Sequence, residues 1–520
     1  MADLSAPVLP VQTPAPAGAA TPSPAGPNEY EAQRRRNFAQ LVELGQPRFP
    51  SRYARSATLA QIVKEFAERS AEALAANPPR QQIAGRIVAL RKMGKITFGH
   101  LLDGDTRLQF SLRKDVAGEA LYDSLKYFDI GDIVGLEGAL WRTKTGELTL
   151  AASALTLLTK CLHPLQEKWH GLSDPDTRYR QRYLDLIAEP ESFRTLRLRA
   201  RMVALIRDFF HARGYHEFET PVLQDVAGGA TAKPFVTHHH ALGADLYLRI
   251  ATELHLKRLL VGGFDKVFEL GRLFRNEGID TTHNPEFTTI EWYAAYENMD
   301  YNLALTEELL NGLCKDLCGG ETISYGEHTL SFARPFARIK MEASVLAAMP
   351  AAGLDPADLD RPEKYSALTA QQQLDARKTH QRGGLVGELF AKLVEPGLIQ
   401  PTFVLDHPVE ISPLAKPHPE LPGYTERFEL FAAGREIANA FSELNDPDEQ
   451  RARFTAQAAA KAKGDAEAHP LDEDFLIALE FGMPPAAGEG IGIDRLAMLF
   501  SDAHSIRDVI AFPTLKPRKD

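Results

Sequence analysis

The chain has 520 residues, of which 44% are hydrophobic and 25% are charged, a composition typical of a globular protein with two or three domains. Its net charge of −11 excludes a protein that is basic throughout, although a local basic surface can still bind phosphates. No apolar run reaches the roughly 18–20 residues of a membrane helix, and the N-terminus lacks the pattern of a secretory signal, so we expect a cytoplasmic protein with no membrane partner.

The first 80 residues predict a tail followed by helices. Residues 1–28 are rich in alanine and proline, and such a segment buries too little apolar surface to offset its ordering entropy. We therefore expect a disordered tail. Residues 29–80 contain two amphipathic stretches, around 29–45 and 58–76, and the second ends at Asn77-Pro78-Pro79.

Residues 81–160 change to short alternating runs separated by turn signals. Five strands are predicted from the runs IAGRIVALR, KITFGHLLD, TRLQFSLR, DIVGLEGALWR and GELTLAASALTLLT. The segment GEALYDSLKYF predicts a helix between the third and fourth strands. This order is typical of a small OB-type barrel, and another small β-barrel without a ligand is the alternative.

Residues 161–190 form a polar linker, and residues 191–520 form a large domain of mixed helices and strands. The domain opens with a helix whose apolar stripe follows helical spacing and which closes at Arg213-Gly214. The stripe consists of Leu198, Met202, Leu205 and Phe209.

A polar hairpin is predicted for residues 267–296, VFELGRLFRNEGIDTTHNPEFTTIEWYAAY. Strand periodicity puts Arg275 and Glu277 on one face of its first strand, and Phe287, Glu291 and Tyr293 together on the second. Burying this set without a charged ligand would be costly. A solvated sheet face with ion pairs is the alternative, but the size of the set favours a ligand site.

A second acidic hairpin is predicted at residues 426–447. Glu429 and Glu436 lie on strands joined by a turn, and adjacent carboxylates repel each other unless a cation such as Mg²⁺ joins them. Asn439, Phe441 and Glu443 then recur with period two on one face. The alternative is a surface hairpin.

Glycines precede a helix in GEGIGIDRLAMLF, residues 488–500. Gly488, Gly490 and Gly492 indicate backbone that passes close to another element or a ligand. We expect Asp494 to be the helix N-cap, and Arg495 with the helix N-terminus to favour an anion such as phosphate.

Together these segments resemble the three signature motifs of the class II aminoacyl-tRNA synthetases: the helix and strand ending at Pro221, FRNEG with HNPEFT, and GIGIDR. The strings HGLSDPDTRYRQRYLDL, YLRIATELHLKRLLVGGF and FSELNDP match the bacterial lysyl-tRNA synthetases, from about residue 30 to the C-terminus. The resemblance implies an α+β fold, with an N-terminal OB-type barrel followed by a six-stranded antiparallel catalytic sheet flanked by helices. It also implies a homodimer that joins lysine to tRNA(Lys) with ATP.

The resemblance also assigns roles at the catalytic site. Arg275 would hold the α-phosphate and the lysine carboxylate, Phe287 would stack on adenine, and Arg495 would lie on its other side or near the γ-phosphate. The remaining nucleotide and Mg²⁺ contacts would come from Glu277, His283, Asn284, Glu429 and Glu436. The lysine contacts would come from Gly229, Glu253, Glu291, Tyr293, Asn439, Phe441 and Glu443.

Within that second group, Glu443 and Tyr293 would take the ε-ammonium, and Glu253 and Glu291 would surround the α-amino end. Which glutamate serves which nitrogen stays open. In the barrel, the resemblance assigns the anticodon-binding residues, which are Phe98, Gln109 and Glu147 with Arg86 or Arg91 nearby. A core position in the barrel is the alternative for Phe98.

Three rivals share the fold. Enzymes that attach lysine to elongation factor P lack the OB domain that is predicted here. An aspartyl or asparaginyl synthetase would need cationic pocket residues, whereas Glu253, Glu291 and Glu443 are anionic. A non-catalytic RNA-binding protein would not need Arg275 or Arg495.

Overall fold

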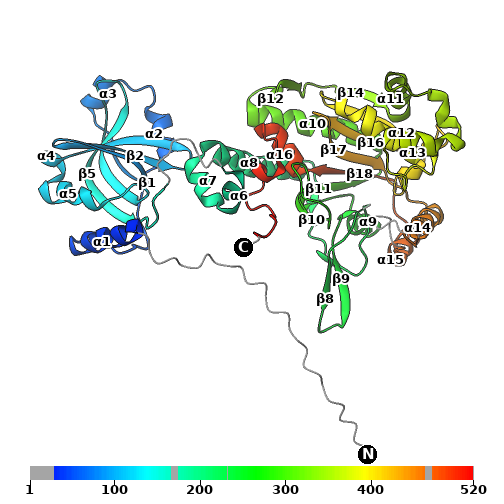
Figure 1. Cartoon of the computed structure of the whole chain (residues 1–520), viewed down its shortest axis with the longest axis horizontal. Helices are drawn as coiled ribbons and strands as arrows, with labels where there is room; N and C mark the ends of the chain where they lie inside the picture. The colour runs from blue at the N-terminus through cyan, green and yellow to red at the C-terminus, as the bar shows by residue number, and fades with distance from the viewer. Residues whose placement is uncertain (1–28, 166–173, 231, 463–470, 519–520) are drawn as a thin grey trace, which may run out of the picture. The chain divides into compact units, whose positions relative to one another are not determined.

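The computed structural model describes residues 29–165, 174–230, 232–462 and 471–518, so the predicted tail 1–28 lies outside the described residues. The chain divides into two compact units, Met1–Ser173 and Asp174–Asp520 (Figure 1). Each unit is described by itself below.

Three helices precede the barrel: α1 (Glu29–Glu43), α2 (Leu59–Phe66) and α3 (Ala71–Ala76). The prediction of one helix over 58–76 is therefore wrong. The Ser70 hydroxyl accepts the N–H of Ala73 and starts a new helix, while the Arg142 guanidinium donates to the carbonyls of Phe66 and Arg69. The break is thus set by a cap and by a side chain from a distant strand.

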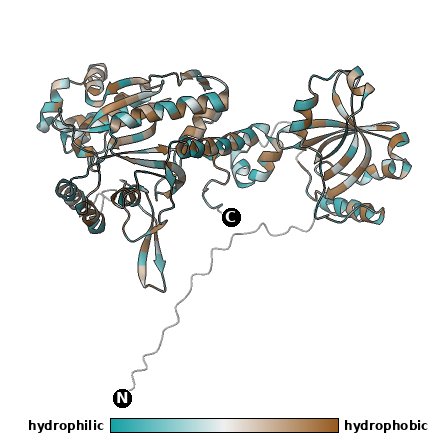
Figure 2. Ribbon diagram, turned by 180° about the vertical axis from the view of Figure 1, so that it is seen from behind, coloured by the Kyte–Doolittle hydropathy of each residue, from teal (hydrophilic) through white to brown (hydrophobic). Residues whose placement is uncertain are grey.

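The barrel closes with its five strands in the order β1-β2-β3-β5-β4, which confirms the predicted OB-type barrel. All neighbouring pairs are antiparallel except β3 with β5. The helices between β3 and β4 are α4 (Lys114–Ala117) and α5 (Glu119–Ser124). The strands are β1 (Arg80–Met93), β2 (Ile96–Asp103), β3 (Thr106–Arg113), β4 (Ile133–Arg142) and β5 (Leu148–Thr159). Hydrophobic and hydrophilic residues alternate along them, as Figure 2 shows, and the hydrophobic ones fill the barrel.

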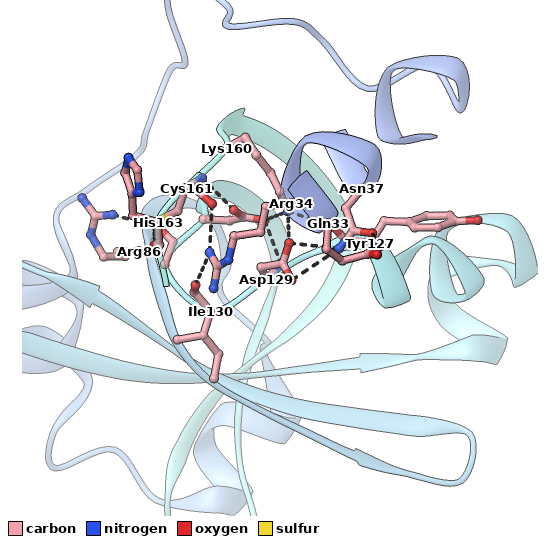
Figure 3. A network of polar contacts seen from close by, with 12 residues as sticks. Gln33, Arg34, Asn37, Arg86, Tyr127, Asp129, Ile130, Lys160, Cys161 and His163 are labelled. Atoms are coloured by element: carbon pink, nitrogen blue, oxygen red, sulfur yellow. Dashed lines mark hydrogen bonds and ion pairs between the residues drawn. The ribbon is translucent and has the colours of Figure 1, made fainter. Parts of the chain in front are cut away.

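A polar network holds α1 against the barrel (Figure 3). Arg34 donates to the carbonyls of Ile130 at 3.0 Å and Cys161 at 2.8 Å. The buried ammonium of Lys160 donates to Asp129 at 2.5 Å and to Asp132 at 2.8 Å. Because these partners satisfy one another, the buried charges are tolerated and α1 is fixed to the barrel.

The second unit opens with three consecutive helices. Two of them, α6 (Pro175–Arg180) and α7 (Arg182–Ala188), lie in the segment predicted as a linker, where Arg182 and Asp185 form a buried ion pair at 2.8 Å. The third, α8 (Pro190–His211), buries Met202, Ile206 and Phe210. The buried stripe thus contains Ile206 and Phe210 where Leu205 and Phe209 were predicted.

The central sheet has eight strands in the order β14-β15-β16-β17-β18-β11-β10-β6. The six strands from β15 to β10 are antiparallel, as predicted, while the short edge strands β14 and β6 pair in parallel. The bounds are β6 (His216–Glu217), β10 (Lys266–Phe274), β11 (Glu286–Ala295), β14 (Ala337–Lys340), β15 (Thr402–Pro408), β16 (Tyr424–Ala432), β17 (Arg435–Ser442) and β18 (Ala486–Gly492).

One face of this sheet packs on helices and the other stays open to a cavity. Phe268, Trp292 and Phe428 bury themselves against α8, α10 (Met299–Cys318) and α16 (Ile493–Ser501). The other helices are α9 (Glu253–Val261), α11 (Met341–Ala348), α12 (Tyr365–Gln372), α13 (Arg382–Leu393), α14 (Pro447–Ala462), α15 (Glu473–Glu480) and α17 (Ile506–Val509), and the minor strands are β7 (Leu223–Gln224), β8 (Val236–His239), β9 (Ala244–Leu248), β12 (Thr322–Tyr325) and β13 (His328–Ser331). Across the described ranges, none of the helices combines the length and apolarity needed to cross a membrane.

Candidate active site

A cavity of about 400 Å³ opens on the free face of the sheet, a size suited to a small-molecule ligand. All but one of the predicted catalytic-unit residues line it. The lining ones are Gly229, Glu253, Arg275, Glu277, His283, Asn284, Phe287, Glu291, Tyr293, Glu429, Glu436, Asn439, Phe441 and Arg495. Glu443 is the exception.

Arg275 and Phe287 form one side of the cavity. Arg275 follows the end of β10, and its guanidinium lies 5.1 Å from the centre of the Phe287 ring. Arg275 and Glu277 are therefore loop residues and not strand residues, a correction to the predicted strand face. Within the described chain, the buried Nε of Arg275 has no hydrogen-bond partner, so this donor is available to an anion.

Arg495 lies across the same end. Its guanidinium donates to the Glu436 carbonyl at 2.9 Å and lies 3.5 Å from Nε2 of His283. Asp494 is not the helix N-cap, because α16 is capped at Gly492. The Asp494 carboxylate instead accepts from the Thr288 N–H and from Arg199, both at 2.6 Å, and these donors hold it inside the protein.

Glu429 and Glu436 lie on β16 and β17, near each other as predicted. The Glu436 side chain, 44% exposed, can still be reached from the cavity. Desolvation by the cavity wall and then the Glu429 charge raise the pKa of Glu436, against the attraction of Arg495. Two carboxylates so placed favour a bound cation.

Arg427 also lines the cavity and was not singled out from the sequence. It donates to Glu429 at 2.6 Å and to the Asn439 amide oxygen at 3.0 Å, so it orients two of the predicted residues. Its position two residues before Glu429 on the same strand face was the available signal.

The other end of the cavity is acidic. Burial and then the charge of Glu253 raise the pKa of Glu291 to about 7. The Glu291 carboxylate accepts from the Thr252 N–H and from the Tyr293 hydroxyl, both at 3.3 Å. Glu253 and Glu291 are both buried and the charge of Glu253 acts on Glu291, an arrangement suited to a cationic ligand.

Glu443 lies behind this acidic wall. Its side chain has no exposed surface and forms an ion pair with Lys257, which also contacts Glu253. The prediction that Glu443 shares a face with Asn439 and Phe441 is confirmed, because its N–H continues the ladder to the Ala486 carbonyl and a Cβ at Gly488 would meet its Oε1 beside the Tyr293 ring. Its carboxylate lies too deep to line the cavity. The sequence interpretation also missed Lys257, although its place four residues after Glu253 was a signal.

The barrel carries a separate polar patch, with a cavity of about 450 Å³ lined in part by His100, Gln109 and Glu147. Glu147 accepts from Gln109 at 2.6 Å and contacts His100 at 3.0 Å. Phe98, two residues before His100, is half-buried and pairs with Arg91 in register, so it is not a core residue.

Arg86 is placed differently, since its guanidinium donates to the Gly131 carbonyl near the α1 network (Figure 3). Of the two arginines predicted near the patch, the structure thus favours Arg91. Over the described ranges, no group of three or more His, Cys, Asp or Glu side chains is arranged to hold a metal by itself.

Comparisons with known proteins match both units. The family model of class II tRNA synthetases (D, K and N) matches residues 174–516, and that of the OB-fold nucleic acid binding domain matches residues 81–158. The lysine–tRNA ligases of Pasteurella multocida and Histophilus somni are each 49% identical to the chain over 486 residues, which is 93% of this chain and 97% of each relative. That of Lysinibacillus sphaericus is 47% identical over 489 residues.

Proposed function

The chain belongs to the class II tRNA synthetases of the D, K and N group, and on this basis we propose that its cavity activates lysine with ATP and passes the lysyl group to tRNA(Lys). The reaction is lysyl-tRNA synthesis, an ATP-dependent ligation. The observation that carries the choice of lysine is the acidic end of the cavity, where Glu253 and Glu291 are buried together. Aspartate or asparagine would bring no side-chain cation to this site.

We assign the nucleotide to the arginine end. Arg275 would bind the α-phosphate and the lysine carboxylate, because its guanidinium faces the cavity with an unpaired Nε. The Phe287 ring would stack on adenine, and Arg495 would cover the nucleotide from the other side or reach its γ-phosphate. Glu277, His283 and Asn284, on the loop between β10 and β11, would place the rest of the nucleotide.

Glu429 and Glu436 would hold Mg²⁺. Magnesium ions in nucleotide sites use one or two carboxylates together with phosphate oxygens, so two carboxylates suffice and no larger metal cluster is required. Burial first and the charge of Glu429 second raise the pKa of Glu436 despite the nearby arginines, which fits a carboxylate pair that a further cation would stabilise. When bound, the metal would neutralise developing charge on the phosphates.

The lysine end would hold two ammonium groups and an aliphatic stem. Glu253 and Glu291 would surround the α-amino end with the backbone at Gly229, Phe441 would line the stem, and Asn439 would orient the carboxylate. Tyr293 would reach the ε-ammonium. Glu443 would pair with that ammonium from a buried position, since its Oε1 lies beside Tyr293 and Gly488, which line the cavity.

The first step needs no general base, because the lysine carboxylate is already ionised at neutral pH. One of its oxygens attacks the α-phosphorus of ATP, the bond to the β-phosphate oxygen breaks, and pyrophosphate leaves. Arg275 and Arg495 orient the two anions and stabilise the charge that develops. In the second step the terminal ribose hydroxyl of tRNA attacks the adenylate carbonyl and AMP leaves.

The barrel would read the anticodon. Stacking of a splayed base on Phe98, with Gln109, Glu147 and Arg91 reading its edges, is the usual way in which single-stranded RNA is recognised. Gln109 and Glu147 already hydrogen-bond each other, so their orientation is set before RNA binds. We also propose that the chain forms a homodimer and that it is located in the cytoplasm. The three free cysteines among the described residues are in line with this location.

ATP–pyrophosphate exchange with lysine, aspartate and asparagine tests the proposal. Exchange with lysine alone is expected, and exchange with none of the three would favour a non-catalytic RNA-binding protein. At residue level, Glu291→Gln should raise the KM for lysine at least about tenfold while the KM for ATP stays nearly constant. Glu286→Gln is the matched control, since Glu286 lies on the same strand, is 46% exposed and pairs with Arg272. An equal rise of both KM values would contradict the assignment.

A further inference from the structure

Lys257 places a buried cation directly behind the acidic end of the cavity. It lies on α9, and its side chain has no exposed surface. Its ammonium contacts Glu253 at 2.5 Å, forms an ion pair with Glu443 and lies 5.5 Å from the centre of the Phe441 ring. Glu253 and Phe441 line the cavity, so the cation sits one layer behind its wall.

Charged and titratable groups from four parts of the fold face this cation. Glu253 on α9 and Glu443 after β17 act on it directly, and Glu291 and Tyr293 on β11 and Arg427 on β16 act on those two carboxylates or are acted on by them. Burial alone would lower the pKa of Lys257, but the charges of Glu253 and Glu443 outweigh it and raise the pKa, so the ammonium stays charged. Burial raises the pKa of Glu443 well above its usual value, although the adjacent Lys257 opposes that rise.

We propose that Lys257 is a positioning residue that fixes the charge of the lysine site. Glu253, Glu291 and Glu443 bring three carboxylates, and the resident ammonium of Lys257 cancels one of them. Two negative charges then remain for the two ammonium groups of the incoming lysine, while its carboxylate meets Arg275. This inference rests on the proposed activation of lysine and deepens it.

Removal of the Lys257 charge has a defined consequence. Glu253 and Glu443 would then lie on either side of an uncharged residue, buried and without the cation that both of them contact. Two such carboxylates share a proton and do not both ionise. Lysine would have to displace that proton to bind, so its affinity in a Lys257 variant would rise more steeply with pH than in the wild type.

Proton release on lysine binding tests this directly. The full chain is titrated with lysine by calorimetry at about pH 7, in buffers of different ionisation enthalpy. The wild type is expected to release at most about one proton, from Glu291, whose pKa is about 7. Release of two or more would overturn the inference, because the carboxylates beside Lys257 would then be protonated in the empty site.

Lys257→Met should release about one proton more than the wild type, and its KM for lysine should fall about tenfold more between about pH 6 and pH 8. Its KM for ATP should not change. Lys266→Met is the matched control, since Lys266 is a half-buried lysine outside the cavity wall, near the Tyr215 ring. The same proton count in Lys257→Met and in the wild type would refute a charge role.

The outcomes separate this inference from the proposed function. Absence of lysine-dependent pyrophosphate exchange in the wild type would remove the proposed function itself. Normal exchange with an unchanged proton count would remove only the role of Lys257. If Lys257→Met does not fold, Lys257→Gln replaces it, and the wild-type proton count decides the question in either case.

Discussion

A methyl group added at Gly488 should damage lysine binding far more than nucleotide binding. Gly488 lies on β18, opposite Tyr293 in the sheet register. A Cβ atom there would lie 2.0 Å from Oε1 of Glu443 and 2.3 Å from the Tyr293 ring. Ordinary contacts begin near 3.4 Å, so both groups would have to move by more than about 1 Å, or the strand would have to shift.

Displacements of that size have known costs. A misplacement of about 1 Å at a binding site can reduce activity about a hundredfold, and overpacking costs about 1–3 kcal/mol of stability. We therefore expect Gly488→Ala to raise the KM for lysine about 10- to 100-fold in pyrophosphate exchange. The KM for ATP should change little, because the arginines and Phe287 lie at the other end of the cavity.

Gly490→Ala is the comparison variant on the same strand face. A Cβ at Gly490 would lie 3.5 Å from the nearest atom, Cγ of Glu291, which is an ordinary contact. Its effect on lysine should therefore be much smaller than that of Gly488→Ala. Equal loss of lysine affinity in the two variants would refute the reasoning, because the clash with Glu443 and Tyr293 would then not be the cause.

Three further predictions concern the barrel, the core and pH. Phe98→Ala should reduce tRNA charging while pyrophosphate exchange stays nearly intact, since the barrel is not part of the catalytic cavity. Glu489→Gln should stabilise the fold at neutral pH in urea denaturation, because burial raises the pKa of Glu489 well above its usual value. Glu489 ionises above about pH 4.5 in the unfolded chain but stays protonated in the folded one. The free energy of unfolding of the wild type therefore falls by up to about 1.4 kcal/mol per pH unit above pH ~4.5. Lysine affinity should increase as the pH rises through about 7, because Glu291 must lose its proton to pair with an ammonium group.

Each of these three predictions would be contradicted by a specific result. Loss of exchange in Phe98→Ala equal to the loss of charging would place Phe98 in folding and not in RNA recognition. If the stability gain of Glu489→Gln over the wild type is no larger at pH 7 than at pH 5, Glu489 is ionised in the folded protein. Lysine affinity that stays constant across pH 7 would exclude Glu291 as the titrating contact.

The barrel and the antiparallel core of the sheet were predictable because their signals are local. Alternation with period two and clear turn residues set the five barrel strands and the hairpin of β10 and β11. The break between α2 and α3 was not predictable, since it depends on Arg142 from a distant strand. The parallel edge strands β6 and β14 were not predicted for a similar reason. They are two and four residues long, and only tertiary pairing defines them.

The candidate site shows the same division at the level of single residues. Periodicity assigns a side chain to a face, and for Glu291, Tyr293 and Phe441 the face was correct. It does not give the depth at which a side chain is buried. Glu443 follows the last residue of β17 on the same face as Phe441, but its carboxylate is fully buried and forms an ion pair with Lys257 of α9. That ion pair joins residues 186 positions apart, so it cannot be predicted from local sequence patterns. Only the packing of α9 against the sheet reveals that Lys257, which does not line the cavity, supplies part of the charge of the lysine site.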